Sequence, residues 1–163
     1  MPRKTLKKIL PSHKKIKENK MLKIFGSLLH KKEIWSLSRK KVLAGVFIGM
    51  FVAFIPMPFQ MLLVAVIAII LNVNLPIPLA LIWISNPFTM PFIYYFEYEL
   101  GNILLNNQNA IEFSFDTMQE NLSQIASSLY VGAFVLCSVA SILSVVVLNF
   151  LWIKKVKKQR KNR

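Results

Sequence analysis

Three long apolar stretches dominate the chain, and short polar or acidic segments separate them. They cover residues 42–71, 75–96 and 129–153. The last stretch is uninterrupted, has the length of an ordinary membrane crossing, and ends at Trp152 before a cluster of lysines. An interfacial aromatic residue followed by basic residues is typical of the cytoplasmic end of a transmembrane helix. We predict that this stretch crosses the bilayer from outside to inside.

The first stretch is too long for one straight crossing. As a single α-helix its 30 residues would measure about 45 Å, whereas the hydrocarbon core of a bilayer is about 30 Å thick. Pro56-Met57-Pro58 lies at its centre, where two prolines remove two amide donors and fix two φ angles. We therefore expect a Pro-broken helical hairpin or re-entrant pair of half-helices, over residues 42–55 and 59–71.

The second stretch is broken near its centre by Asn86-Pro87 and again by Pro91. The segment that follows, residues 97–128, holds every charge of the region 42–153, and all of these charges are acidic. We predict that it forms an outer loop. Apolar residues recur at helical spacing between positions 111 and 125, which predicts a short amphipathic helix within that loop.

The basic residues are confined to the two ends of the chain. All 21 Lys and Arg residues lie outside residues 42–153: the arm, residues 1–41, carries 14 of them, and the tail, residues 154–163, carries seven. Flanks rich in Lys and Arg are retained in the cytoplasm, so both termini are expected there. Two cytoplasmic termini require an even number of crossings. We predict an all-α, multi-pass integral membrane protein in which one stretch returns to its own side or crosses twice.

The arm shows a second pattern. Between Met21 and Trp35 the apolar residues gather on one side of a helical projection, with lysines opposite. This pattern is typical of an amphipathic helix that lies in the membrane interface. The bilayer and its anionic lipid head groups are therefore the expected partners of arm and tail. Nucleic acid is not expected, because no recognition motif accompanies the charge.

Residues that carry catalytic or metal chemistry are scarce. Cys137 is the single cysteine and lies within an apolar run, while His13 and His30 fall in the basic arm. These positions provide neither a disulfide nor a cluster of metal ligands. No hydrolase motif or glycine-rich phosphate loop occurs. We expect neither an enzyme nor a bound cofactor or metal.

The most specific internal signal is a repeat, in which residues 54–61 align with residues 83–90 and four of eight positions are identical. Paired, proline-interrupted apolar segments indicate a binding site near the bilayer midplane, because freed backbone groups can hold a polar ligand there. The candidate substrate contacts are Gln60, Asn86 and Thr89; the candidate helix breaks are Pro56, Pro58, Pro87 and Pro91; the accessory candidates are Asn74, Glu97 and Glu99. The alternative reading is purely structural: paired kinks, a turn-forming Asn74 and solvated glutamates. In the first reading we expect the breaks to pack together, with Pro58 near Pro87.

A longer set of residues occurs in order between Ile34 and Gly101. It comprises Ile34-Trp35, Ala44-Gly45, Gly49, Pro56-Met57-Pro58, Gln60, Asn74, Trp83-Ile84-Ser85-Asn86-Pro87-Phe88-Thr89, Pro91, Tyr95 and Leu100-Gly101. This set resembles the signature of the bacterial membrane domain of unknown function 2062, closely over residues 34–105 and loosely over the final span. The resemblance implies a small bacterial inner-membrane protein of unestablished activity. Some relatives are fused to sugar-transferring domains, which hints at envelope biogenesis.

Two functions stay open at this point. The first is the handling or translocation of an anionic or lipid-linked envelope substrate through a midplane site formed by the two broken segments. The second is a membrane-anchored assembly or interaction factor without transport activity, whose basic ends bind acidic partners or anionic lipid. Homo-oligomerisation is compatible with both.

Overall fold

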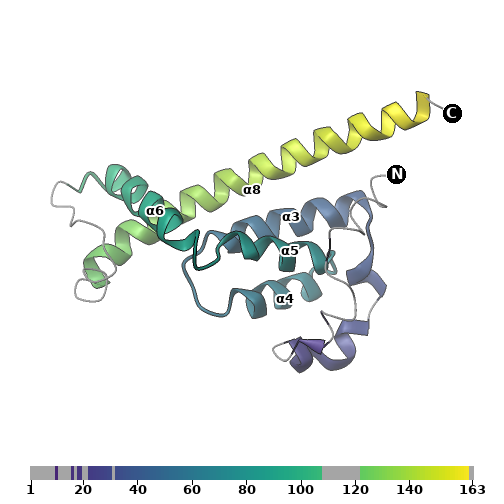
Figure 1. Ribbon diagram of the computed structural model, residues 1–163, viewed down its shortest axis with the longest axis horizontal. Coiled ribbons are helices and arrows are strands. Elements are labelled where there is room, and N and C mark those ends of the chain that lie inside the picture. The colour runs from purple at the N-terminus through teal and green to yellow at the C-terminus, as the bar shows by residue number, and fades with distance from the viewer. Residues whose placement is uncertain are drawn as a thin grey trace.

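The computed structural model describes residues 10, 16, 18–19, 22–30, 32–107 and 122–161. This part of the chain is mostly helical, with bends and turns between the helices. The helices are η1 (Leu22–His30), η2 (Lys32–Trp35), α3 (Arg39–Ala53), α4 (Gln60–Ile70), α5 (Pro76–Leu81), η3 (Ile82–Ile84), α6 (Met90–Leu105) and α8 (Leu122–Lys161). Figure 1 shows α8 as a long rod that α6 crosses near one end, while α3, α5 and α4 lie beside one another along it. The all-α expectation is confirmed for this part of the chain.

Among the described residues, α8 is the helix that is long and apolar enough to cross a bilayer. The most apolar window of its candidate span, Ile125–Arg160, has a mean hydropathy of 2.6, and only 22% of that window is buried within the protein. Large side chains such as those of Phe134, Ile142 and Phe150 are exposed. A core helix of a soluble protein would cover these side chains, so the exposed apolar surface of α8 supports membrane association.

The first apolar stretch is divided into two helices, as the sequence predicted. α3 ends at Ala53 and α4 begins at Gln60. Phe59, immediately before α4, adopts the left-handed conformation with φ 62°, which helps to turn the chain back. With 15 and 11 residues, α3 and α4 measure about 22 and 16 Å, and each is shorter than a hydrocarbon core of about 30 Å.

Glycines set how closely α3 and α5 pack. A Cβ atom at Gly49 would lie 2.7 Å from the Cα atom of Pro78, and one at Gly45 would lie 3.0 Å from the Asn74 carbonyl oxygen. The order of these contacts shows that α5 runs in the same direction as α3. Gly45 and Gly49, which are four residues apart, therefore serve close helix packing.

α3 and α8 run in opposite directions. Arg39, the first residue of α3, donates from Nε to Oδ1 of Asn149 in the second half of α8, at 2.8 Å. At the other end of the pair, the Tyr130 hydroxyl donates to the carbonyl oxygen of Pro56 at 2.8 Å. The start of α3 and the basic end of α8 consequently lie at the same end of the molecule (Figure 1).

The second apolar stretch is interrupted once. η3 ends at Ile84 and α6 begins at Met90, so the break at Asn86-Pro87 is confirmed. Pro91 lies in the first turn of α6 instead of forming a further break, because an amide hydrogen has no helical acceptor at that position and its loss costs nothing.

The acidic segment contains more helix than the sequence analysis predicted. α6 continues to Leu105 and α8 begins at Leu122, so both ends of the predicted loop 97–128 are helical. Glu97 and Glu99 lie on α6. Most of the predicted amphipathic helix, between positions 108 and 121, falls outside the described residues.

The arm differs from the predicted single amphipathic helix. It forms two 3₁₀ segments, η1 and η2, and η1 is kinked at Gly26, where φ is 40°. Leu22, Leu29 and Ile34 are buried in the same core as residues of α4 and α5. The apolar face of the arm is therefore partly occupied by protein contacts.

α6 and α8 cross with their backbones in contact. A Cβ atom at Gly132 would lie 1.8 Å from the carbonyl oxygen of Glu97, and one at Gly101 would lie 1.7 Å from the carbonyl oxygen of Ser128. Each glycine thus receives the backbone of the other helix, which no other residue type would permit. We call this contact the glycine crossing.

The glycine crossing predicts an unusually large effect of one methyl group. We expect Gly132→Ala to lower the free energy of unfolding of the detergent-solubilised protein by at least the roughly 1–3 kcal/mol that overpacking costs. The reason is that the new Cβ atom would push the Glu97 backbone away. The matched control is Val139→Leu, which adds a methylene group to an exposed position of the same helix. Equal melting temperatures for the two variants would contradict the crossing.

Candidate functional site

Gln60 connects the two breaks. Its Nε2 donates to the carbonyl oxygen of Ile55 at 2.8 Å, and its Oε1 accepts from the Ser85 hydroxyl at 3.2 Å. Gln60 and Ser85 are both buried, at 9% and 8% exposure. The Ile55 carbonyl is one of the groups that lose a helical partner where α3 ends. Gln60 therefore satisfies the first break and ties it to the second.

Asn86 and Thr89 satisfy the second break locally. The Asn86 Oδ1 accepts from the backbone N–H groups of Phe88 and Thr89 at 2.9 and 3.2 Å, while its Nδ2 donates to the Trp83 carbonyl at 3.3 Å. The Thr89 hydroxyl accepts from the Asn86 N–H at 3.0 Å and donates to the Ile84 carbonyl. This is an Asx-type turn that leads directly into α6.

The repeat has a structural meaning that these bonds make plain. Gln60 and Thr89 occupy equivalent positions of the two copies, and so do Ile55 and Ile84. In each copy the polar side chain donates to the carbonyl of that isoleucine, five residues earlier. The repeated sequence thus encodes the same solution to the same break.

Asn74 also has a structural role. Its Nδ2 donates to the Ser36 carbonyl at 3.0 Å, its Oδ1 accepts from the Ile77 N–H at 3.3 Å, and it is 1% exposed. It joins the segment before α3 to the first turn of α5. Both of its polar side-chain atoms are thus bonded within the protein.

The two accessory glutamates differ sharply. Glu99 is exposed, whereas Glu97 is 0% exposed and neither of its carboxyl oxygens has a hydrogen-bond partner. The side chains of Asn102 and Ser128 are likewise buried without partners. These three residues lie at or beside the glycine crossing, so the reading of Glu97 as a solvated loop charge does not describe it.

Both breaks line one pocket of about 350 Å³, which we call the break pocket. Its lining residues are Met57, Pro58, Phe59, Gln60, Met61, Ile82, Trp83, Ser85, Asn86, Pro87 and Met90. The structure therefore brings Pro58 and Pro87 together around one space, in line with the expected apposition. It places Gln60 and Asn86 at this pocket with their polar atoms largely committed to the breaks.

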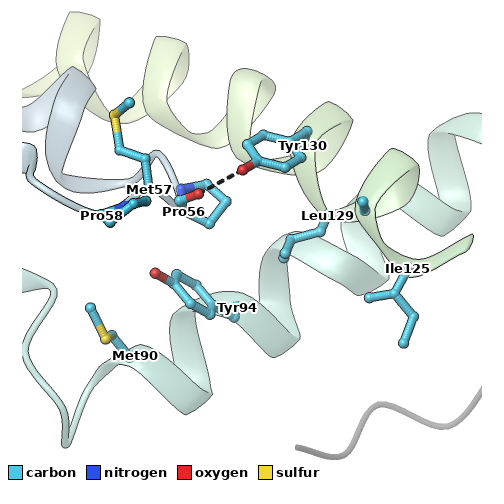
Figure 2. A pocket seen from close by; sticks show the side chains of 9 residues that line it. Pro56, Met57, Pro58, Met90, Tyr94, Ile125, Leu129 and Tyr130 are labelled. Carbon is cyan, nitrogen blue, oxygen red and sulfur yellow. Dashed lines mark hydrogen bonds between the residues drawn. The ribbon is translucent and has the colours of Figure 1, made fainter. Parts of the chain in front are cut away.

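A second pocket, of about 390 Å³, lies between the first break, α6 and α8, and we call it the tyrosine pocket. Its lining residues are Pro56, Met57, Pro58, Met90, Tyr94, Ile125, Ala126, Leu129 and Tyr130. Figure 2 shows the Tyr94 hydroxyl pointing toward Pro58 and the Tyr130 hydroxyl reaching Pro56. Sequence reasoning missed this pocket, because its walls come from three segments with no shared local pattern.

The chemistry of the tyrosine pocket is that of a site for an amphipathic molecule. Its walls are aliphatic or thioether side chains, and the aromatic rings of Tyr94 and Tyr130 carry its side-chain polar atoms. Its volume falls within the range of small-molecule sites, which are mostly apolar with a few placed polar groups. Neither pocket is lined by Lys or Arg.

Taken together, the fold and the pockets define a small protein whose described residues form a helical fold, with one long, exposed apolar helix and two broken segments. The family model of an uncharacterised protein conserved in bacteria, domain of unknown function 2062, matches residues 22–161. The match covers most of the chain, and the chain belongs to this family. No curated protein and no solved structure matches it.

The bonds of Gln60 predict a loss of stability when its amide is removed. We expect Gln60→Leu to lower the free energy of unfolding by about 1–3 kcal/mol, because the Ile55 carbonyl is left unpaired in a buried position. Ser85→Ala, combined with it in a double-mutant cycle, should show positive coupling. Ser138→Ala, whose hydroxyl bonds only to its own helix, is the control. If Gln60→Leu leaves the free energy of unfolding unchanged but abolishes ligand binding, Gln60 is instead a ligand contact.

Proposed function

We propose that this protein is a bacterial inner-membrane protein that binds the apolar chain of a lipid or lipid-linked envelope molecule in the tyrosine pocket. The observation that carries the proposal is the lining of that pocket: apolar walls with two tyrosine rings, formed where a proline-broken segment meets the exposed apolar helix α8. An apolar chain would replace lipid against these walls. Its polar end would meet the tyrosine hydroxyls.

The arrangement of the helices supports a topology with an even number of crossings. We place α8 across the bilayer once, and α5, η3 and α6 together across it in the opposite direction with the break within the span. α3 and α4 then enter from the cytoplasm and return, since each is shorter than the hydrocarbon core. The support is the antiparallel pairing of α3 with α8, which puts Arg39 beside Asn149 and the two basic flanks on one side.

This topology predicts which exposed positions react with a membrane-impermeant thiol reagent. In a background without Cys137, single cysteines at Lys40 and Lys158 should be labelled only from the cytoplasm, and one at Asn107 only from outside. All three positions are exposed, so access depends on the side of the membrane alone. Labelling of positions 40 and 158 from opposite sides would overturn the even crossing count.

The pockets favour an apolar chain over an anionic group as the bound part of the ligand. Neither lining contains a basic side chain. At the start of α6 the Met90 N–H is bonded to the Asn86 carbonyl at 2.8 Å, and Pro91 has no N–H, so few amide donors are free to hold an anion there. The proposal therefore narrows the sequence-based hypothesis: Gln60, Asn86 and Thr89 shape the break, and the chain of the substrate lies in the adjacent pocket.

The proposal predicts that filling the tyrosine pocket excludes the ligand. The probe is a phosphatidylethanolamine with a photoreactive group near the end of one acyl chain, incorporated with the protein in nanodiscs; a polyprenol with the same group is the second probe. Peptide mapping should place the crosslinks in the segments 90–94 and 125–130. Ala126→Trp should reduce them at least about tenfold, the effect of about 1.4 kcal/mol, because the indole would occupy the pocket.

The matched control for this experiment is Val139→Trp, which adds the same bulk at an exposed position of α8 and should keep the crosslinks in place. Crosslinks scattered evenly over exposed apolar positions in all three proteins would contradict a pocket. That result, with function lost when the tail lysines are replaced by glutamine, would favour the assembly factor. The specific support for this second candidate is that both basic flanks lie at one end, where each lysine contributes on the order of 1 kcal/mol toward anionic lipid.

A further inference from the structure

Glu97 stands in an environment that a carboxylate does not tolerate. It is completely buried, and both carboxyl oxygens lack a hydrogen-bond partner. Among the described residues, the titratable side chains close enough to feel its charge are Tyr94 on its own helix and Cys137 on α8. No Lys or Arg occurs between residues 42 and 153, so neither α6 nor the part of α8 that crosses it carries a cation there.

Such a carboxylate must be relieved, because an isolated buried charge is far more costly than a neutral polar group. Its side chain is completely buried, so water does not reach the carboxyl group while the glycine crossing stays closed. A metal ion finds no group of three or more His, Cys, Asp or Glu side chains among the described residues. Binding of a proton to the carboxyl group is the remaining way to remove the buried negative charge, and it needs no additional space.

The closed crossing is also the floor of the tyrosine pocket. Tyr98, Ile125 and Leu129 form a buried cluster there, and Tyr94 packs against it. Ile125, Leu129 and Tyr94 line the pocket. Any separation of α6 from α8 would therefore change the shape of the pocket.

We propose that Glu97 is a proton-binding site that controls the tyrosine pocket: the protonated side chain keeps α6 and α8 in contact, and loss of the proton to water opens the crossing. The ligand part of this proposal rests on the proposed function. When a ligand binds the closed form, Glu97 takes up a proton. The affinity of the ligand therefore falls as pH rises through the titration of Glu97. The limit for one linked proton is about tenfold per pH unit.

The first test needs no ligand. Infrared spectra of the full-length protein in nanodiscs should contain, at neutral pH, the C=O stretch of a protonated carboxyl group shielded from water. We expect Glu97→Gln to remove this band and Glu99→Gln, a change at the exposed glutamate two residues away, to keep it. Glu97→Asp should retain a shifted band. Absence of the band in the unaltered protein, or its survival in Glu97→Gln, would overturn the proton site.

The second test uses the photoreactive phosphatidylethanolamine at increasing pH. Crosslinks in the tyrosine pocket should decline as pH rises in the unaltered protein and in Glu99→Gln. In Glu97→Gln they should be independent of pH, because glutamine resembles the neutral acid. A pH dependence that persists in Glu97→Gln would refute the control by Glu97. Failure of the probe to label the pocket at any pH, with the infrared band intact, would refute the proposed ligand but leave the proton site standing.

Discussion

The rest of the structure depends on one requirement: backbone groups released at the two proline breaks must find partners inside the protein, since a buried backbone group without a partner costs free energy. The partners come from other elements. The Ile55 carbonyl is satisfied by Gln60, which also holds Ser85 of the second break, and the Pro56 carbonyl is satisfied by Tyr130 of α8. The same bonds that repair the first break thereby fix α4, the second break and α8 around it.

Two glycine contacts make this arrangement sterically feasible. Gly49 lets α5 lie against α3, and Gly132 lets α6 lie against α8. With the backbones this close, the two breaks meet in one pocket, and the first break also faces α8 across a second pocket. The contact of Gly132 with α6 also encloses Glu97, which lies where α6 meets α8. A closely packed helix crossing and a buried acidic side chain are thus two aspects of one geometry.

The features that the sequence revealed are those with local causes. Proline stops a helix wherever it stands in the interior, so the breaks at Pro56-Met57-Pro58 and Asn86-Pro87 were predictable, and so was the single apolar helix near the C-terminus. The extent of α6 was not, because the acidic residues were read as solvated. The bent arm depends on the backbone of Gly26, and the tyrosine pocket on the meeting of Tyr94 with Tyr130. Both are tertiary outcomes that one-dimensional periodicity does not encode.

The internal repeat predicted two breaks, and the structure contains them, but their polar side chains bond to the backbone. It correctly indicated two equivalent breaks, and equivalent side chains do bond equivalent carbonyls. Glutamine is longer than threonine, however, so Gln60 also reaches Ser85, whereas the bonds of Thr89 stay within its own turn. The polar atoms of the repeat are already hydrogen-bonded within the protein. A further molecule would therefore bind at the surfaces next to the breaks. The tyrosine pocket is the surface at which a break, a crossing helix and an enclosed carboxyl group come together.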